Sequence, residues 1–172
     1  MDYLFYPGLL VPVTICGITD LRDGIVRNRV VLLTAVTGLM YHVFIGQGPA
    51  YSLTGGLVGL LAGYIGYRYG GMAGGDLKFI TALGIWLGVH DLYWVLLIGS
   101  LIGVVWGVAV LLKHRQFLAT VKEMAYIRYG VAFLRKIPED ADAPLPKDAI
   151  PFATCLALAT WLVVALKGGH IW

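Results

Sequence analysis

Apolar runs recur along the whole chain and constrain its fold more than any other feature of the sequence. Hydrophobic residues make up 59% of the 172 residues and charged residues 13%, about half the charged share of a soluble domain. A helix that crosses a bilayer needs about 20 mostly apolar residues, and fewer where neighbouring helices shelter it. We therefore predict an all-α, polytopic membrane protein, a bundle of about six transmembrane helices over residues 3–19, 30–46, 52–67, 77–88, 92–112 and 150–166.

The basic residues are distributed unevenly between the two sides of such a bundle. If the helices alternate in direction, twelve of the thirteen Lys and Arg residues fall on one side, and Lys167 alone falls on the other. Basic residues are enriched in the cytoplasmic segments of membrane proteins, so the first side is predicted to be cytoplasmic. We expect a multi-pass protein of the plasma (inner) membrane, with membrane lipid around it and both termini outside. Nothing in the charge pattern indicates binding to nucleic acid.

The single domain, residues 1–172, contains one long segment without a predicted span. Residues 114–149 carry apolar side chains at helical spacing, interspersed with basic residues, and end in a polar, proline-rich stretch. We predict a cytoplasmic amphipathic helix at the membrane surface. A plain connector and an element that contacts the substrate are alternatives that the sequence leaves open.

Small and polar residues inside the predicted spans have structural explanations. Glycines recur every four residues in the third and fifth spans, which favours close packing within one bundle and leaves a homo-oligomer open. Cys16 and Cys155 lie in apolar runs and form no metal-binding motif, so we expect buried thiols, no metal and no cofactor. His42 is predicted to be a hydrogen-bonded packing residue rather than a metal ligand.

Two acidic residues lie at the edges of predicted spans. Most of the ten acidic side chains, including Asp23 and Asp91, are interpreted as solvated. Asp20 directly follows the first span and Asp76 directly precedes the fourth, so both are predicted to lie at cytoplasmic helix ends at a similar depth. A carboxylate at a membrane boundary is costly unless it is hydrated or paired, which makes it a functional candidate. Alternatively, Asp76 is a helix N-cap and Asp20 a helix-flanking charge.

Two carboxyl groups that approach one another have a specific chemistry. Because like charges held close together do not both ionise easily, the pair shares a proton. The ionised member then removes a proton from water while the protonated member polarises a carbonyl, as in aspartic proteases. The glycine cluster at residues 70–75 would let the loop before Asp76 bend and approach an extended substrate.

Three stretches of the sequence resemble motifs of one family. The stretch "AGGDLK", residues 73–78, resembles the GxGD motif of type IV prepilin peptidases, with Ala73 in place of its first glycine. The stretch "DLRDGIVRN", residues 20–28, resembles the motif around their first aspartate, with Arg27 in place of the usual proline. The stretch "AIPFA", residues 149–153, is similar to a family feature at the start of the last span.

The resemblance implies an intramembrane aspartyl endopeptidase that removes the short basic leader from prepilin or pseudopilin precursors at the cytoplasmic face. It implies that Asp20 and Asp76 are the catalytic pair, that Gly74 and Gly75 shape the loop, and that Lys78 is a supporting cation. The chain lacks the four-cysteine zinc-binding insertion of the larger bifunctional relatives. It therefore resembles the short, peptidase-only forms of Flp/Tad-type pili or preflagellins, and no N-methyltransferase activity is expected.

Two other functions are compatible with the same residues. A small ion- or proton-coupled transporter would use Asp20 and Asp76 as ligands for its coupling ion. Their predicted position at one membrane face, rather than at the midplane, argues against a transporter. A catalytically inactive relative that serves as an assembly scaffold is the third interpretation.

Overall fold

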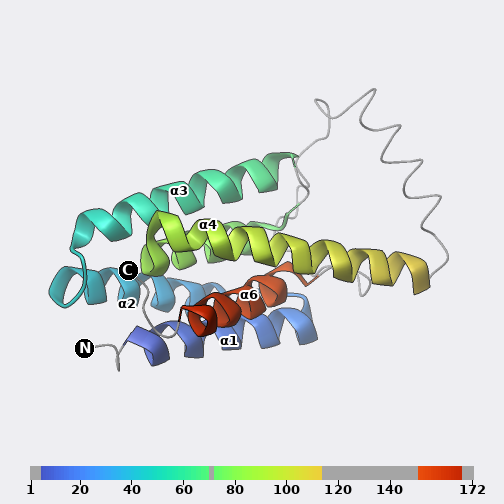
Figure 1. The fold of residues 1–172 in the computed structure, drawn as a ribbon, viewed down its shortest axis with the longest axis horizontal. Helices are drawn as coiled ribbons and strands as arrows, with labels where there is room; N and C mark the ends of the chain where they lie inside the picture. Colours follow the sequence, from blue (N-terminus) through green and yellow to red (C-terminus); the bar gives the residue numbers. More distant parts are fainter. Residues whose placement is uncertain (1–4, 70–71, 114–150, 168–172) are drawn as a thin grey trace.

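The described elements are all helices, which confirms the predicted all-α class. The computed structural model describes residues 5–69, 72–113 and 151–167. The predicted amphipathic segment 114–149 and Gly70 and Gly71 of the glycine cluster lie outside the described residues. The helices are α1 (Phe5–Asp23), α2 (Asn28–Phe44), α3 (Pro49–Tyr69), α4 (Gly74–Lys113) and α6 (Phe152–Leu166) (Figure 1).

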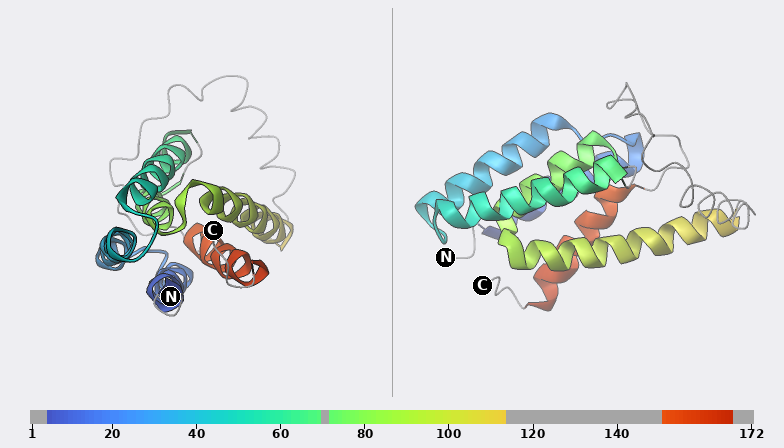
Figure 2. Two further views of the ribbon diagram at one scale, coloured as in Figure 1. Left: turned by 60° about the vertical axis from the view of Figure 1, so that its left-hand side comes forward. Right: turned by 90° about the horizontal axis from the view of Figure 1, so that it is seen from above.

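Helix α4 is interrupted at Gly88, where the chain reverses its direction. Gly88 has φ 69° and ψ −176°, a conformation that is open to glycine and strained for other residues. The two parts of α4 coincide with the fourth and fifth predicted spans, so each predicted span lies on its own helical segment. Successive segments alternate in direction, and the second part of α4 extends past the start of α6 (Figures 1 and 2).

Side chains of α2 and α3 satisfy the carbonyl groups that the break releases from the helical pattern. The hydroxyl of Tyr51 donates to the carbonyl oxygen of Leu87 at 2.6 Å, and Nε2 of His42 donates to that of Trp86 at 2.9 Å. The tyrosine ring fills the place where a side chain at Gly88 would lie. Buried carbonyl groups without partners are costly, so these bonds stabilise the reversal. His42 is fully buried, as predicted for a packing residue.

The first part of α4 is the centre of the bundle. Its side chains Phe79, Leu83 and Trp86 are almost completely buried, between the helices on either side. Helix α3 approaches it through the first glycine stripe: a Cβ on Gly59 would lie 2.7 Å from the carbonyl oxygen of Ile80, and Gly55 meets the backbone of Gly84. The glycines of α3 therefore pack within the bundle.

The outer surface of the bundle is largely apolar. Large hydrophobic side chains are exposed on every described helix, for example Leu32 at 65%, Leu53 at 61% and Val105 at 70% exposed. By length and composition alone, one described stretch, Gly74–Val110, is apolar enough for a membrane-crossing helix, although the reversal at Gly88 divides it into two segments. The helices Asn28–Phe44 and Phe152–Leu166 are apolar but shorter.

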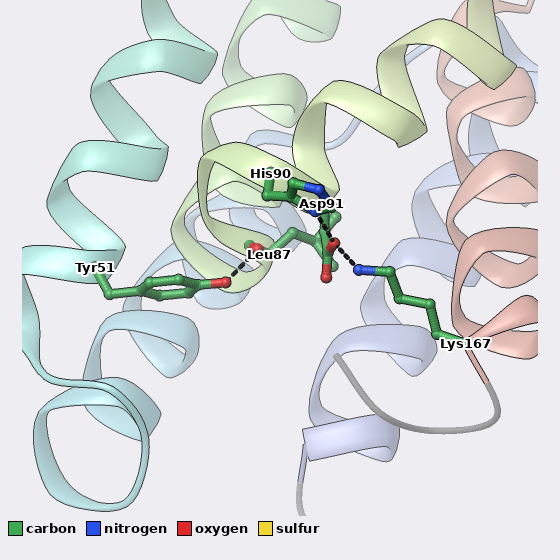
Figure 3. A network of polar contacts seen from close by, with 5 residues as sticks. All are labelled: Tyr51, Leu87, His90, Asp91 and Lys167. Carbon is green, nitrogen blue, oxygen red and sulfur yellow. Dashed lines mark hydrogen bonds and ion pairs between the residues drawn. The ribbon is translucent and has the colours of Figure 1, made fainter. Parts of the chain in front are cut away.

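Asp91 was predicted to be solvated, and the structure shows that this prediction is wrong. Asp91 is 3% exposed and its carboxylate pairs with Nζ of Lys167, beyond the end of α6. Nδ1 of His90 lies 3.1 Å from the same carboxylate oxygen (Figure 3). The reversal at Gly88 explains the burial, because it turns the start of the second part of α4 towards the end of α6.

Candidate active site

Asp20 and Asp76 lie at the same end of the bundle, although different helices carry them. Asp20 is in the last turn of α1 and Asp76 in the first turn of α4. The two side chains are 3% and 5% exposed, and their carboxyl groups are close enough to interact electrostatically. The fold therefore brings together the two acidic residues that the sequence singled out.

The carboxyl group of Asp20 contacts the first turn of α6. The backbone N–H of Thr154 donates to Oδ2 of Asp20 at 3.0 Å. Oγ1 of Thr154 lies 3.4 Å from Oδ2. The first N–H groups of a helix have no partners within it and carry a partial positive charge, so they suit a carboxylate.

Gly17 allows α6 to come this close to α1. A Cβ on Gly17 would lie 2.8 Å from the Cβ of Ala157, which is shorter than carbon atoms tolerate. The hydroxyl of Thr154 donates to the carbonyl oxygen of Gly17 at 2.8 Å. This hydrogen bond holds the first turn of α6 against α1 at Gly17, about one helical turn before Asp20.

Asp76 is the third residue of α4. The alternative interpretation of Asp76 as the N-cap of this helix is therefore wrong. Its Oδ2 accepts a hydrogen bond of 3.3 Å from the backbone N–H of Ala73, the residue directly before the helix. This is the reciprocal half of a capping box, in which the third helical residue bonds back to the N-cap. Asp76 can therefore stabilise the start of α4 and still take part in acid–base chemistry.

Gly74 and Gly75 lie in the first turn of α4, directly after the loop, and their role in shaping that loop stays a prediction. A Cβ on Gly75 would lie 3.2 Å from the Cβ of Val26. The segment between α1 and α2 thus packs tightly over the start of α4. Lys78 is exposed, and its Nζ donates to Oδ1 of Asn28 at 3.1 Å.

These contacts join the stretch at residues 20–28 to the stretch at residues 73–78. Asp23, the other acidic residue of the first stretch, is exposed, and its Oδ2 lies 3.9 Å from Nη2 of Arg27. It has the solvated position that was predicted for it. Within the first stretch, only Asp20 combines burial with an electrostatic contact to Asp76.

Sequence reasoning missed Thr154 and Gly17. Both belong to apolar runs, where a single threonine or glycine has an ordinary packing explanation. The available signal was the position of Thr154, a hydroxyl residue in the first turn of the span that follows "AIPFA". Cys16 and Cys155 are buried as predicted, and both interact electrostatically with Asp20. Among the residues that the structure describes, no group of three or more His, Cys, Asp or Glu side chains is arranged to hold a metal ion.

The arrangement supports proton transfer. Two buried carboxyl groups that interact with each other do not both ionise easily. Such a pair provides a base and an acid within one site, and the pair can act on water and on a carbonyl group together.

Known proteins resemble this chain over the same part of the sequence. The type IV leader peptidase family matches residues 8–108, a range that contains both aspartates. Two curated relatives, both named prepilin leader peptidase/N-methyltransferase, come from Aeromonas salmonicida strain A449 and from Aeromonas salmonicida. Each is 31% identical over 110 residues, which are 56% of this chain and 37% of the relative. The matched part is thus little more than a third of each relative's length. No solved structure matches the chain significantly.

Proposed function

The chain belongs to the type IV leader peptidase family, and we propose that it is a membrane-embedded aspartyl endopeptidase that uses Asp20 and Asp76 as its catalytic pair. Its proposed substrates are prepilin or pseudopilin precursors, which carry a short basic leader before an apolar helix. Cleavage would take place at the cytoplasmic membrane face.

One observation carries this proposal. Asp20 and Asp76 are far apart in the sequence, yet they are buried together and interact electrostatically at one end of the bundle. A buried carboxylate requires compensation, and two that interact at one end of the bundle are costly for stability alone. A hydrolytic pair is the function that best explains this cost.

The chemistry follows from the pair itself. The ionised carboxylate removes a proton from water, and the water oxygen forms a bond to the carbon of the scissile amide. The protonated carboxyl group gives its proton to the carbonyl oxygen. When the C–N bond breaks, the amine takes the proton from the first aspartate, and a hydroxyl of the intermediate returns a proton to the second. Water and amide thus give acid and amine, and both carboxyl groups return to their starting states.

The apolar outer surface supports a position in the membrane. Exposed hydrophobic side chains on every described helix are typical of contact with lipid and unusual in a soluble monomer. We propose that all six helical segments cross or enter the bilayer, with both termini outside and the pair on the cytoplasmic side. We also propose that the chain has no N-methyltransferase activity, because its two cysteines cannot form a four-cysteine zinc site.

A cleavage assay tests the proposal. The purified full chain in lipid nanodiscs is incubated with a peptide that has a basic leader, a glycine and an apolar helix, and the products are identified by mass spectrometry. We expect a single cut that releases the leader. The control is an Asp76→Asn preparation made in the same way, which should leave the peptide intact. Equal cleavage by both preparations would point to a contaminating protease, and no cleavage by folded wild-type protein would refute the proposed substrate class.

A further inference from the structure

The two carboxyl groups of the proposed pair have unequal hydrogen-bond partners. Oδ2 of Asp20 accepts the backbone N–H of Thr154 at 3.0 Å, and Oγ1 of Thr154 lies 3.4 Å from the same oxygen. Asp76 accepts one longer hydrogen bond, 3.3 Å from the backbone N–H of Ala73. Hydrogen bonds donated to a carboxyl group favour its ionised form. The two groups therefore differ in how well the protein stabilises their negative charge.

The side chain of Thr154 keeps its own backbone N–H in place. A threonine hydroxyl has one proton to donate, and the 2.8 Å distance to the carbonyl oxygen of Gly17 shows where it goes. This bond ties the first turn of α6 to α1, and Asp20 follows on α1 within one turn. The backbone N–H of Thr154 is thereby held towards Oδ2 of Asp20.

We propose that Thr154, through the start of α6, holds Asp20 as the ionised member of the pair, so that Asp20 is the base that acts on water and Asp76 the acid that protonates the substrate carbonyl. Thr154 is then a positioning residue that acts through Asp20. This inference rests on the proposed function and deepens it, because the proton transfers described above acquire a direction. Asp20 takes the proton of water, and Asp76 gives its proton to the carbonyl oxygen.

Titratable side chains on three helices interact with Asp20. Among the described residues, Cys16 on α1, Cys155 on α6 and Asp76 on α4 interact electrostatically with it. Thiols in model peptides titrate near pH 8.5, well above carboxyl groups at about 4. The acid limb of a pH profile of kcat/KM therefore reports the carboxyl pair.

The first experiment compares three variants in the cleavage assay. Thr154→Val removes the hydroxyl at nearly constant volume, and Thr154→Ser restores it. Thr160→Val is the matched control, because Thr160 lies on the same helix, is fully buried and donates only within α6, to the carbonyl oxygen of Leu156 at 2.8 Å. The full chain is assayed in nanodiscs over a range of pH, and kcat and KM are measured separately.

We expect Thr154→Val to lower kcat about tenfold with KM nearly unchanged, because release of the first turn of α6 from Gly17 weakens the hydrogen bond from the backbone N–H of Thr154 to the carboxylate of Asp20. Ionisation of a less well stabilised Asp20 requires a higher pH, so the acid limb should move up by about one pH unit. Thr154→Ser and Thr160→Val should both behave like the wild type. The inference is overturned if Thr154→Val matches Thr160→Val, or if activity falls without a shift of the acid limb and without recovery in the serine variant.

A second measurement does not depend on cleavage. The full chain is labelled with ¹³C at the aspartate carboxyl carbons, and the resonances of the pair are assigned by their loss in Asp20→Asn and Asp76→Asn. At neutral pH the Asp20 resonance should have the shift of a carboxylate and the Asp76 resonance that of a carboxylic acid. The opposite assignment, or two carboxylates, would refute the inference even if cleavage occurs. Absence of cleavage by the wild type would refute the proposed function and leave this readout unaffected.

Discussion

Nζ of Lys78 donates a hydrogen bond to Oδ1 of Asn28 at 3.1 Å, which joins the start of α4 to the start of α2. Asn28 is the last residue of the stretch that contains Asp20, and Lys78 the last of the stretch that contains Asp76. The two stretches are therefore linked on the protein surface as well as through their buried carboxyl groups.

This surface link should contribute modestly to activity. Lys78→Met removes the donor, and an exposed polar contact is worth about 0–1 kcal/mol in the free energy of unfolding. We expect a severalfold loss of leader release in the cleavage assay, with little change in thermal stability. Asn28→Ala should have the same effect, and the double variant should be no worse than either single one. A complete loss in Lys78→Met would instead indicate a direct chemical role.

Asp20→Asn and Asp76→Asn should each abolish cleavage in the proposed mechanism while the protein stays folded. An amide has nearly the volume of a carboxyl group but cannot act as its base or share its proton. Leader release is measured by mass spectrometry and folding by circular dichroism in nanodiscs.

The chain supplies its own control for this prediction. Asp23→Asn changes an exposed carboxylate and should retain most of the activity. Because the pair acts as a unit, the double variant Asp20→Asn/Asp76→Asn should be scarcely worse than either single variant. Normal cleavage by all the variants would contradict the proposed aspartyl mechanism.

Gly17→Ala should displace α6 from α1. The added Cβ would lie 2.8 Å from that of Ala157, and relief of such overpacking typically costs about 1–3 kcal/mol. Movement of α6 separates Thr154 from Asp20, so we expect at least a tenfold loss of kcat. Gly103→Ala is the control, since its Cβ would have ordinary contact distances, the nearest being 3.7 Å to Phe152. Equal activity of the two variants would show that close contact of α1 and α6 is unimportant.

Asp91→Asn should destabilise the protein from the opposite end of the bundle. It leaves Lys167, 27% exposed, without its carboxylate partner, and we expect a loss of about 1–3 kcal/mol in the free energy of unfolding. The exposed pair of Asp23 and Arg27 provides the comparison, because Asp23→Asn should change stability by less than about 0.5 kcal/mol. Denaturation in mild detergent, followed by tryptophan fluorescence, measures both. Equal stability of the two variants would mean that burial of Asp91 has no energetic consequence.

The proposed orientation is tested by thiol labelling. Arg22 at the end of α1 and Gln47 between α2 and α3 are both exposed and lie at opposite ends of α2. In a chain with Cys16 and Cys155 replaced by alanine, a membrane-impermeant maleimide should label Arg22→Cys only in inside-out vesicles and Gln47→Cys only in right-side-out vesicles. The reverse pattern would invert the orientation, and labelling of both from one side would contradict the membrane-spanning arrangement.

The helical segments and the acidic pair were predictable because each has a local signature. Long apolar runs indicate helices wherever they lie, and a carboxylate such as Asp20 or Asp76 stands out at the edge of such a run. The sequence also predicted two separate spans, 77–88 and 92–112, on either side of the reversal at Gly88.

The features that were not predicted depend on contacts between residues that are distant in sequence. The burial of Asp91 follows from a reversal that points it towards Lys167, and charge alone does not reveal this. The helical start at Gly74 and the bonds from Thr154 to Asp20 depend on how helices pack, which apolar periodicity does not specify. A threonine or glycine at a helix crossing has the same local sequence as one elsewhere in the core.

The order of the helices along the chain determines when the contact between Thr154 and Asp20 can form during synthesis. Helix α6 follows all other described helices in the sequence, so a ribosome synthesises both aspartates well before it synthesises Thr154. A nascent chain that stops before residue 151 contains the two carboxyl groups but lacks the α6 N–H group that contacts Asp20. The complete arrangement can therefore exist only after Thr154 has been synthesised, and translation products that stop before this residue lack it.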